Sequence, residues 1–185
     1  MTTSSGTMTG MEWRTRRAVA EDVPEIASIN VAAWRSAYRG IVPQAVLDGM
    51  SEQRRAAGWS GFLREPEPTA LFVAVRADGR IGAYCSVGAV RLDADAHRDL
   101  PTGELFAIYA APDLRGTGAG HAVHEHAREH LAASGFRHAV LWVLVDNAPS
   151  RRFYEAHGWR CDDVVQNLRM AGEDVVEVRY SRSLG

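Results

Sequence analysis

Residues 104–120 read ELFAIYAAPDLRGTGAG, an apolar strand that runs into a glycine-rich turn. We expect the strand over Glu104–Ala110 and a helix from about Gly118 to Ala133. Glycine lets the backbone bend tightly and approach a ligand without a Cβ in the way. Free N–H groups at a helix N-terminus favour an anion, and Arg115 adds a fixed positive charge. The turn therefore predicts a site for a phosphate-bearing ligand, with a purely structural turn as the alternative.

Two familiar phosphate-binding motifs fit this turn poorly. A Walker loop requires a lysine, and all 21 basic side chains of the chain are arginine. A dinucleotide fingerprint requires Gly-x-Gly-x-x-Gly near the start of its fold. Here the third glycine comes one residue early, and the motif lies beyond the middle of the chain. Because Asp146 is a candidate ribose-binding acid, a dinucleotide remains an alternative ligand.

The segments around the turn predict an α/β fold. Capping and proline signals indicate helices that begin near Glu21, Ser51 and Pro149. The sheet is expected to be mixed, with about seven strands, helices on both faces and a strand–helix–strand crossover over 104–145 at its centre. Alternating or continuous apolar residues indicate the other strands at 13–18, 71–76, 81–88, 139–145, 159–168 and 175–181.

Length and composition predict one globular domain. The chain has 185 residues, of which 46% are apolar and 24% charged. We place a single domain at 11–185, after a Ser/Thr/Gly-rich stretch at 1–10 that is expected to be disordered, and Met11 is an alternative start. The two cysteines, Cys85 and Cys161, are too few for a disulfide framework or a four-ligand zinc site.

Charge and hydropathy argue against several classes of partner. Dedicated binders of nucleic acid or anionic membranes carry a large positive excess, whereas the net charge here is −2. No apolar stretch reaches the length of about 18 residues that is typical of a membrane span. The N-terminal stretch also lacks the charged and apolar regions of a signal peptide. We therefore expect no nucleic acid, no membrane and a cytoplasmic location.

Two motifs, taken together, resemble the GNAT acetyltransferases. Arg115–Gly120 has the pattern Arg-x-x-Gly-x-Gly after a strand that ends in Ile108-Tyr109-Ala110-Ala111-Pro112. Downstream, Asn147–Trp159 reads NAPSRRFYEAHGW and is similar to the second motif of that superfamily. The resemblance implies an acetyl-CoA-dependent N-acetyltransferase with a mostly antiparallel sheet and a central splayed pair of parallel strands. Members of the family are often homodimers, so a homodimer is also implied, although the sequence marks no interface.

The resemblance implies roles for individual residues as well. The main chain of Ile108, Tyr109 and Ala110 would meet the pantetheine arm and the acetyl carbonyl of the cofactor. Asn147 would hydrogen-bond that arm, and Tyr154 would lie near the cofactor sulfur. The pyrophosphate would be held at the turn, by Arg115 and by the backbone of Gly116, Thr117, Gly118, Ala119, Gly120 and His121.

Acetyl transfer to an amine uses a base for the amine proton and an acid for the leaving thiolate. An alkyl amine with a pKa near ~10 is almost wholly protonated at pH 7, so its proton must be removed. Glu104, four residues before Ile108, is the candidate base, with a structural salt bridge as an equal alternative. Tyr154 is the candidate acid for the leaving thiolate, or else a packing side chain. Trp34 and Tyr38 are candidates for the wall of the acceptor site or for the core.

The histidines of the predicted helix and the acidic loop before the central strand each have a simpler explanation than a functional site. His126–His130 matches the His-x-x-Glu-His pattern of zinc proteases, but the sequence offers no third ligand, so we predict no metal. The acidic loop at 91–102 either attracts a cationic amine or is a solvated surface. Neither pattern changes the expected function.

Three functions are consistent with these motifs. The first is transfer of acetyl from acetyl-CoA to a small-molecule amine that attacks the thioester directly. The second is acetylation of a peptide or protein N-terminus, and the third is a non-catalytic acyl-CoA-binding regulatory domain. Because Tyr154, Asn147 and the whole glycine turn are present, we favour an enzyme over a binding domain.

Overall fold

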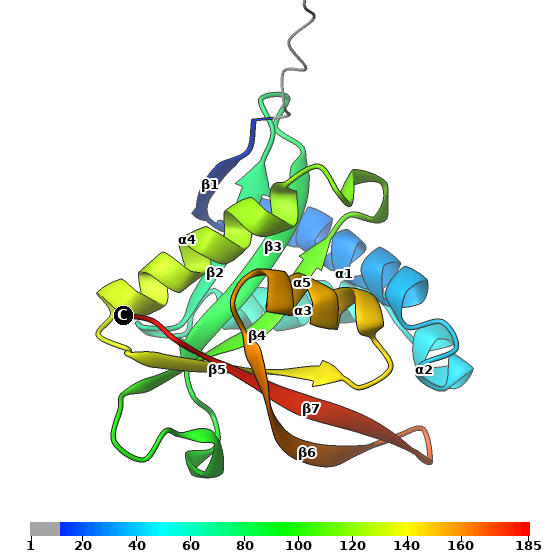
Figure 1. The fold of residues 1–185 in the computed structure, drawn as a ribbon. Helices are drawn as coiled ribbons and strands as arrows, with labels where there is room; N and C mark the ends of the chain where they lie inside the picture. The colour runs from blue at the N-terminus through cyan, green and yellow to red at the C-terminus, as the bar shows by residue number, and fades with distance from the viewer. Residues whose placement is uncertain (1–11) are drawn as a thin grey trace, which may run out of the picture.

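The computed structural model describes residues 12–185, which form a seven-stranded sheet in the order β1-β2-β3-β4-β5-β7-β6 (Figure 1). All neighbouring strands are antiparallel except β4 and β5, which are parallel. The prediction of a mixed, mostly antiparallel sheet with one parallel pair is therefore confirmed. The predicted tail at 1–10 and Met11 lie outside the described residues. The strands are β1 (Arg14–Arg17), β2 (Ala70–Val75), β3 (Ile81–Ala89), β4 (Thr102–Ala110), β5 (His138–Leu144), β6 (Arg160–Met170) and β7 (Glu173–Ser183).

Local capping signals explain where several helices begin. Ser51 Oγ accepts from the backbone N–H of Arg54, and Asn147 Oδ1 accepts from the backbone N–H of Ser150. One helix, α2, was not expected, because five residues are too few for an apolar repeat to show in the sequence. The helices are α1 (Val23–Ala37), α2 (Gln44–Asp48), α3 (Glu52–Phe62), α4 (Ala119–Ala133) and α5 (Ala148–Ala156).

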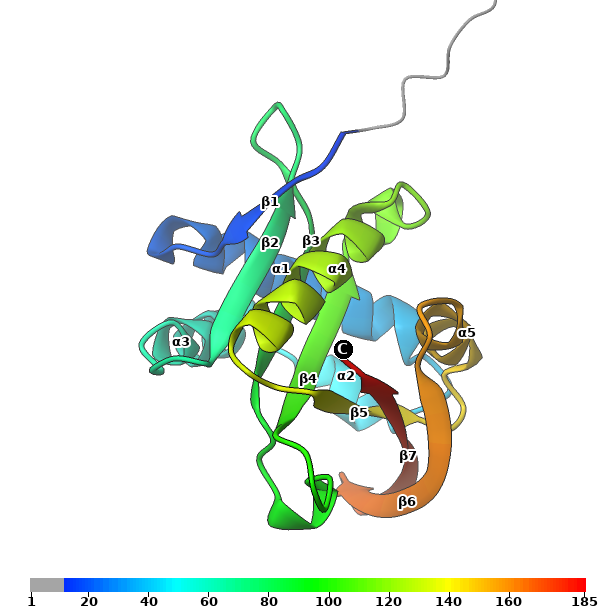
Figure 2. The ribbon, with the colours of Figure 1, turned by 60° about the vertical axis from the view of Figure 1, so that its left-hand side comes forward.

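The helices cover the two faces of the sheet, as Figure 2 shows: α4 crosses one face, while α1 and α3 lie behind the other. Val123, Ala127 and Leu131 of α4 are buried in one apolar cluster with side chains of the central strands. Ile26 and Ile29 of α1 belong to a second cluster on the opposite face. Successive side chains of a strand alternate between these two faces, so neighbouring residues of β4 serve different layers.

The parallel strands β4 and β5 separate soon after they meet. Their pairing covers only residues 102–104 of β4 and 138–140 of β5, although β4 continues to Ala110. Farther along, the N–H of Ala111 donates to Gly82 O of β3. Because main-chain groups alternate in direction, those of Ile108 and Ala110 point away from β3 toward the side that β5 has left. These N–H and C=O groups are therefore available to a ligand.

A buried histidine lies on the sheet-facing side of α4. His124 is fully buried, and the indole Nε1–H of Trp159 donates to its Nε2 at 2.9 Å. Its Nδ1 lies 2.9 Å from Glu125 Oε1. Burial, together with the neighbouring His157, lowers the pKa of His124 to about 4. The imidazole is therefore neutral at physiological pH and acts as a hydrogen-bond acceptor in the core.

This histidine makes the stability of the protein sensitive to acid. Between about pH 6.5 and 4, this histidine binds a proton in the unfolded chain, where its pKa is ordinary. In the folded protein His124 stays neutral over the same range. Above pH 6.5 the imidazole is neutral in both states, and the free energy of unfolding has its full value. As the pH falls below 6.5, protonation of the unfolded chain lowers that free energy by at most about 1.4 kcal/mol per pH unit. We expect urea unfolding of His124→Leu to depend less steeply on pH over this range than that of the wild type. Equal slopes would contradict a neutral, buried imidazole.

Candidate active site

The glycine turn presents unpartnered N–H groups at the start of α4. Gly116 and Gly118 adopt φ angles of +76° and +92°, a left-handed conformation that glycine tolerates best. Gly118 is the N-cap and has no side chain to bond the first turn, and Thr117 Oγ1 instead donates to Leu114 O. Among the described residues we find no acceptor for the N–H groups of Gly118, Ala119 and Gly120. The turn is therefore built to receive an anion.

Side chains around the turn hold it in place and add positive charge. Trp13 Nε1–H donates to Thr117 O at 2.9 Å, which ties the turn to the N-terminal segment. The exposed guanidinium of Arg115 donates to Ser36 Oγ of α1 at 3.0 Å. His121 Nδ1 lies 2.8 Å from His157 Nε2. The residues that the sequence predicted for pyrophosphate binding, Arg115 to His121, thus lie together at one helix N-terminus.

A second group of predicted residues meets on the opposite face of β4. The hydroxyl groups of Tyr38 and Tyr109 lie 3.1 Å apart, and the rings of Trp34 and Tyr38 are 4.7 Å apart, edge to face. Burial raises the pKa of both Tyr38 and Tyr109. Both phenols are therefore neutral at physiological pH. The amide of Asn147, besides capping α5, interacts with the hydroxyl of Tyr38.

Tyr154 is buried in the apolar cluster between α4 and the sheet. Its side chain comes from α5 and is 7% exposed, with ring centroids 6.3 Å from both Trp159 and Tyr180. Burial raises the pKa of its phenol, and the nearby Tyr38 acts in the same direction. No hydrogen bond of the Tyr154 hydroxyl is found within residues 12–185. The phenol therefore keeps its proton and is free to donate it.

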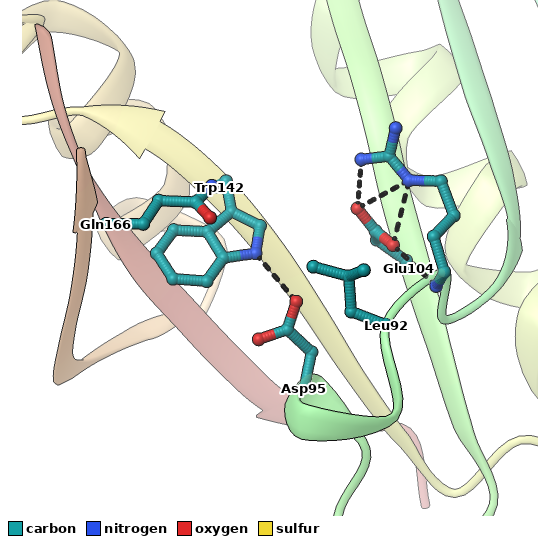
Figure 3. A pocket seen from close by; sticks show the side chains of 6 residues that line it. Leu92, Asp95, Glu104, Trp142 and Gln166 are labelled. Carbon is teal, nitrogen blue, oxygen red and sulfur yellow. Dashed lines mark hydrogen bonds and ion pairs between the residues drawn. The ribbon is translucent and has the colours of Figure 1, made fainter. Parts of the chain in front are cut away.

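A cavity of about 340 Å³ opens beside the first half of β4 (Figure 3). Its walls include the Glu104 carboxylate, which is only 2% exposed and accepts from the backbone N–H and the guanidinium of Arg91. Of the two roles left open for Glu104, the ion pair is the one that the structure displays. In Figure 3, Leu92 lies between this ion pair and the indole of Trp142. The lining residues are Arg91, Leu92, Asp95, Glu104, Trp142 and Gln166.

The acidic loop contributes one buried side chain to this cavity. Asp95 is 6% exposed, accepts from Trp142 Nε1–H at 3.0 Å and pairs with Arg179 at 3.0 Å. The interpretation of the whole loop as a solvated surface is therefore wrong for Asp95. It holds for Asp93 and Asp99, which are exposed. The long-range partners of Asp95 come from β5 and β7, so no pattern of neighbouring residues indicates them.

One carboxylate in this region was missed by sequence reasoning. Glu177 lies in the middle of β7, paired in register with Leu144 of β5 on one side and with Gln166 of β6 on the other. Paired residues share a face, and Leu144 packs in the cluster that contains Trp34 and Tyr38. Glu177 therefore lies on the same face as the phenols. A lone glutamate in an alternating strand carries no signal of such a position.

The histidines of the His-x-x-Glu-His pattern each have other partners. His126 Nδ1 lies 3.0 Å from Thr15 Oγ1, and His130 Nε2 lies 2.9 Å from Pro68 O. Both rings pack edge-on against Phe72. Over residues 12–185, no three His, Cys, Asp or Glu side chains are grouped closely enough to hold a metal ion. In the same part of the chain, no helix has the length and apolar character needed to cross a bilayer.

Comparisons with known proteins agree on one family. The model of the acetyltransferase (GNAT) family matches residues 26–159. The chain is 30% identical over 142 residues to the uncharacterized N-acetyltransferase YuaI of Bacillus subtilis, a match that covers 77% of each protein. It is 31% identical over 93 residues to the mycothiol acetyltransferase of Thermobispora bispora, covering 50% of this chain but only 30% of that protein.

Solved structures show the same fold. A phosphinothricin acetyltransferase from Sinorhizobium meliloti in complex with AcCoA has a TM-score of 0.71 and 22% identity, covering 95% of this chain and 90% of that one. The ribosomal-protein-alanine N-acetyltransferase of Brucella melitensis also has a TM-score of 0.71, with 17% identity, covering 92% of this chain and 99% of that one. At these identities, the likeness concerns the fold.

Proposed function

Because this chain belongs to the acetyltransferase (GNAT) family and is an acyltransferase, we propose that it transfers acetyl from acetyl-CoA to a small-molecule amine. One observation carries this proposal: an anion-binding turn and a free, buried phenol flank the same separated strands, β4 and β5. Acetyl-CoA has a pyrophosphate at one end and a thioester at the other. The residues of this site suit both ends.

The cofactor would be held mainly by the main chain. The free N–H groups of Gly118, Ala119 and Gly120 suit the pyrophosphate, and Arg115 adds charge at the rim. The outward N–H and C=O groups of Ile108 and Ala110 suit the amides of the pantetheine arm. A main-chain N–H beside the thioester carbonyl also stabilises negative charge on that oxygen during attack. Asn147, whose Oδ1 caps α5, would hydrogen-bond the pantetheine arm through its amide N–H groups.

The reaction is a direct transfer in which atoms and charge balance. The lone pair of the acceptor amine attacks the thioester carbonyl carbon, a C–N bond forms, and the C–S bond breaks. The amine loses one proton, and the departing thiolate takes one from the Tyr154 hydroxyl, which is then reprotonated from solvent. With a thiol pKa near ~8.5, this help is useful rather than essential. Acid catalysis of this kind contributes about 100-fold or more in many enzymes.

The acceptor side supports a small molecule more than a long peptide. The cavity beside Glu104 holds about 340 Å³ and lies under the loop between β3 and β4. Trp34 and Tyr38 form an aromatic wall on the same face. A single domain over 11–185, a cytoplasmic location and a homodimer stay predictions from the sequence.

Thermal unfolding with ligands tests the cofactor directly. Acetyl-CoA or CoA at about 100 times its Kd adds roughly 2.7 kcal/mol, which should raise Tm by about 5–10 °C in a domain of this size. NAD should leave Tm unchanged. A shift with NAD alone, or no shift with either CoA species, would contradict the proposed cofactor. Release of free thiol with a panel of amines and a panel of peptides then separates the two acceptor classes.

A further inference from the structure

The hydroxyl of Tyr38 lies where four elements of the proposed site meet. It bonds to the Tyr109 hydroxyl of β4, and it interacts with the amide of Asn147 at the start of α5. Glu177, from β7, is paired in register with Leu144, which packs in the cluster that contains Tyr38. Tyr38 in turn helps to raise the pKa of Tyr154, the proposed acid. Glu177 therefore lies on the face of the sheet that carries Tyr38, although it is distant from Tyr38 in sequence.

The two carboxylates on this face differ in how their oxygens are used. Both oxygens of Glu104 accept from Arg91, through its backbone N–H, its Nε–H and its Nη2–H. Glu177 accepts one hydrogen bond, from Gln166 Nε2–H to Oε2 at 2.9 Å. Within residues 12–185, no basic side chain lies at ion-pair distance from Glu177. Its Oε1 is thus left for a further donor.

The surrounding charges favour a cationic guest beside Glu177. Arg91, from the loop after β3, is paired with Glu104 of β4, and Arg179 of β7 is paired with Asp95 and with Asp162. Tyr38 of α1 is neutral, and Gln166 of β6 carries no charge. Arg179 balances only one of its two carboxylates, and Glu177 is a carboxylate on this face with no ion-pair partner within residues 12–185. An ammonium group would neutralise it.

We propose that Glu177 is the catalytic base, whose carboxylate binds the acceptor as an ammonium ion and removes the proton before the amine attacks. This inference rests on the proposed acetyl transfer. The N–H bond of the ammonium breaks, its proton passes to Oε1 directly or through one water, and the freed lone pair attacks the thioester carbon. As the C–S bond breaks, the nitrogen loses its second proton to solvent, and Glu177 returns its proton to solvent before the next turnover. Separately, burial raises the pKa of Glu177, which makes it a stronger base than an exposed glutamate. Glu104 then acts as a positioning residue that holds Arg91.

The test compares three isosteric changes in the full chain: Glu177→Gln, Glu104→Gln and, as the matched control on the same strand, Glu173→Gln, an exposed residue. Thiol release from acetyl-CoA is followed from pH 6 to 10 with 2-phenylethylamine, putrescine and methionine amide. Acetyl-CoA affinity is measured by calorimetry. We expect Glu177→Gln to lower kcat/KM about 100-fold at pH 7 with unchanged acetyl-CoA affinity, in the range of general-base effects.

The pH profile separates a base from a merely structural residue. Without the carboxylate, only the neutral amine reacts, so the rate of Glu177→Gln relative to the wild type should rise with pH and approach it near the amine pKa, which is ~10 for the two alkyl amines and ~8 for methionine amide. Glu177→Asp, which keeps a carboxylate, should recover activity at pH 7, and Glu173→Gln should match the wild type. Glu177→Gln that keeps the wild-type rate and profile, or a pH-dependent loss confined to Glu104→Gln, overturns the inference. Wild-type protein that binds acetyl-CoA but releases no thiol with any amine instead contradicts the proposed function, and the inference falls with it.

Discussion

Gly118→Val is expected to weaken acetyl-CoA binding about 100-fold, the loss that follows when about 3 kcal/mol of charge-assisted hydrogen bonds is removed. Gly118 has a φ of +92°, which a β-branched residue adopts only under strain. Relief of that strain rotates the peptide units at the start of α4. The N–H groups of Ala119 and Gly120 then no longer converge on the pyrophosphate. Isothermal titration with acetyl-CoA measures the effect.

Gly79→Val provides the matched control for this substitution. Gly79 has a φ of +88°, and a Cβ there would meet nothing within 4 Å, so the backbone strain is similar. It lies in the turn between β2 and β3 and belongs neither to the glycine turn nor to α4. Both variants should lose stability, but only Gly118→Val should lose affinity. Equal affinity losses in the two variants would show that the effect comes from general destabilisation.

Tyr154→Phe is expected to lower kcat about 10–100-fold while acetyl-CoA affinity stays unchanged. This is no more than the lower end of the range of acid catalysis, because a thiol with a pKa near ~8.5 needs little help to leave. The hydroxyl has no hydrogen-bond partner among residues 12–185, so its removal leaves the packing of the ring against Trp159 and Tyr180 intact. What is lost is the proton for the leaving thiolate. The loss should shrink above about pH 8.5, where a thiolate leaves without help. Steady-state thiol release at several pH values, together with calorimetry, measures both quantities.

A neighbouring tyrosine serves as the control. Tyr180 is fully buried beside Tyr154, and its hydroxyl accepts from Arg151 and donates to Glu155. Tyr180→Phe removes these bonds and should lower the free energy of unfolding by about 1 kcal/mol, with little change in kcat. If Tyr154→Phe retains the wild-type kcat, Tyr154 has no part in the chemistry.

Local features of this protein could be predicted from its sequence because their causes lie within a few residues. The turn at Asp78-Gly79 joins β2 and β3, Ser51 and Asn147 cap their helices, and Gly118 begins α4 in a conformation that few other residues accept. The two motifs that carry the family resemblance are also continuous segments. Fold class and family were therefore within reach of the sequence alone.

The sequence by itself determined the glycine turn and the class of reaction, because the backbone conformation of a turn depends on residues that are neighbours in the sequence. Only the tertiary structure decided which of the two carboxylates, Glu104 or Glu177, has no ion-pair partner within residues 12–185. Glu104 is bound by Arg91 from a loop 13 residues earlier, while Glu177 comes to the face that carries Tyr38 because β7 inserts between β5 and β6. Strand order and register depend on packing across the whole sheet, and no spacing within a single segment records them.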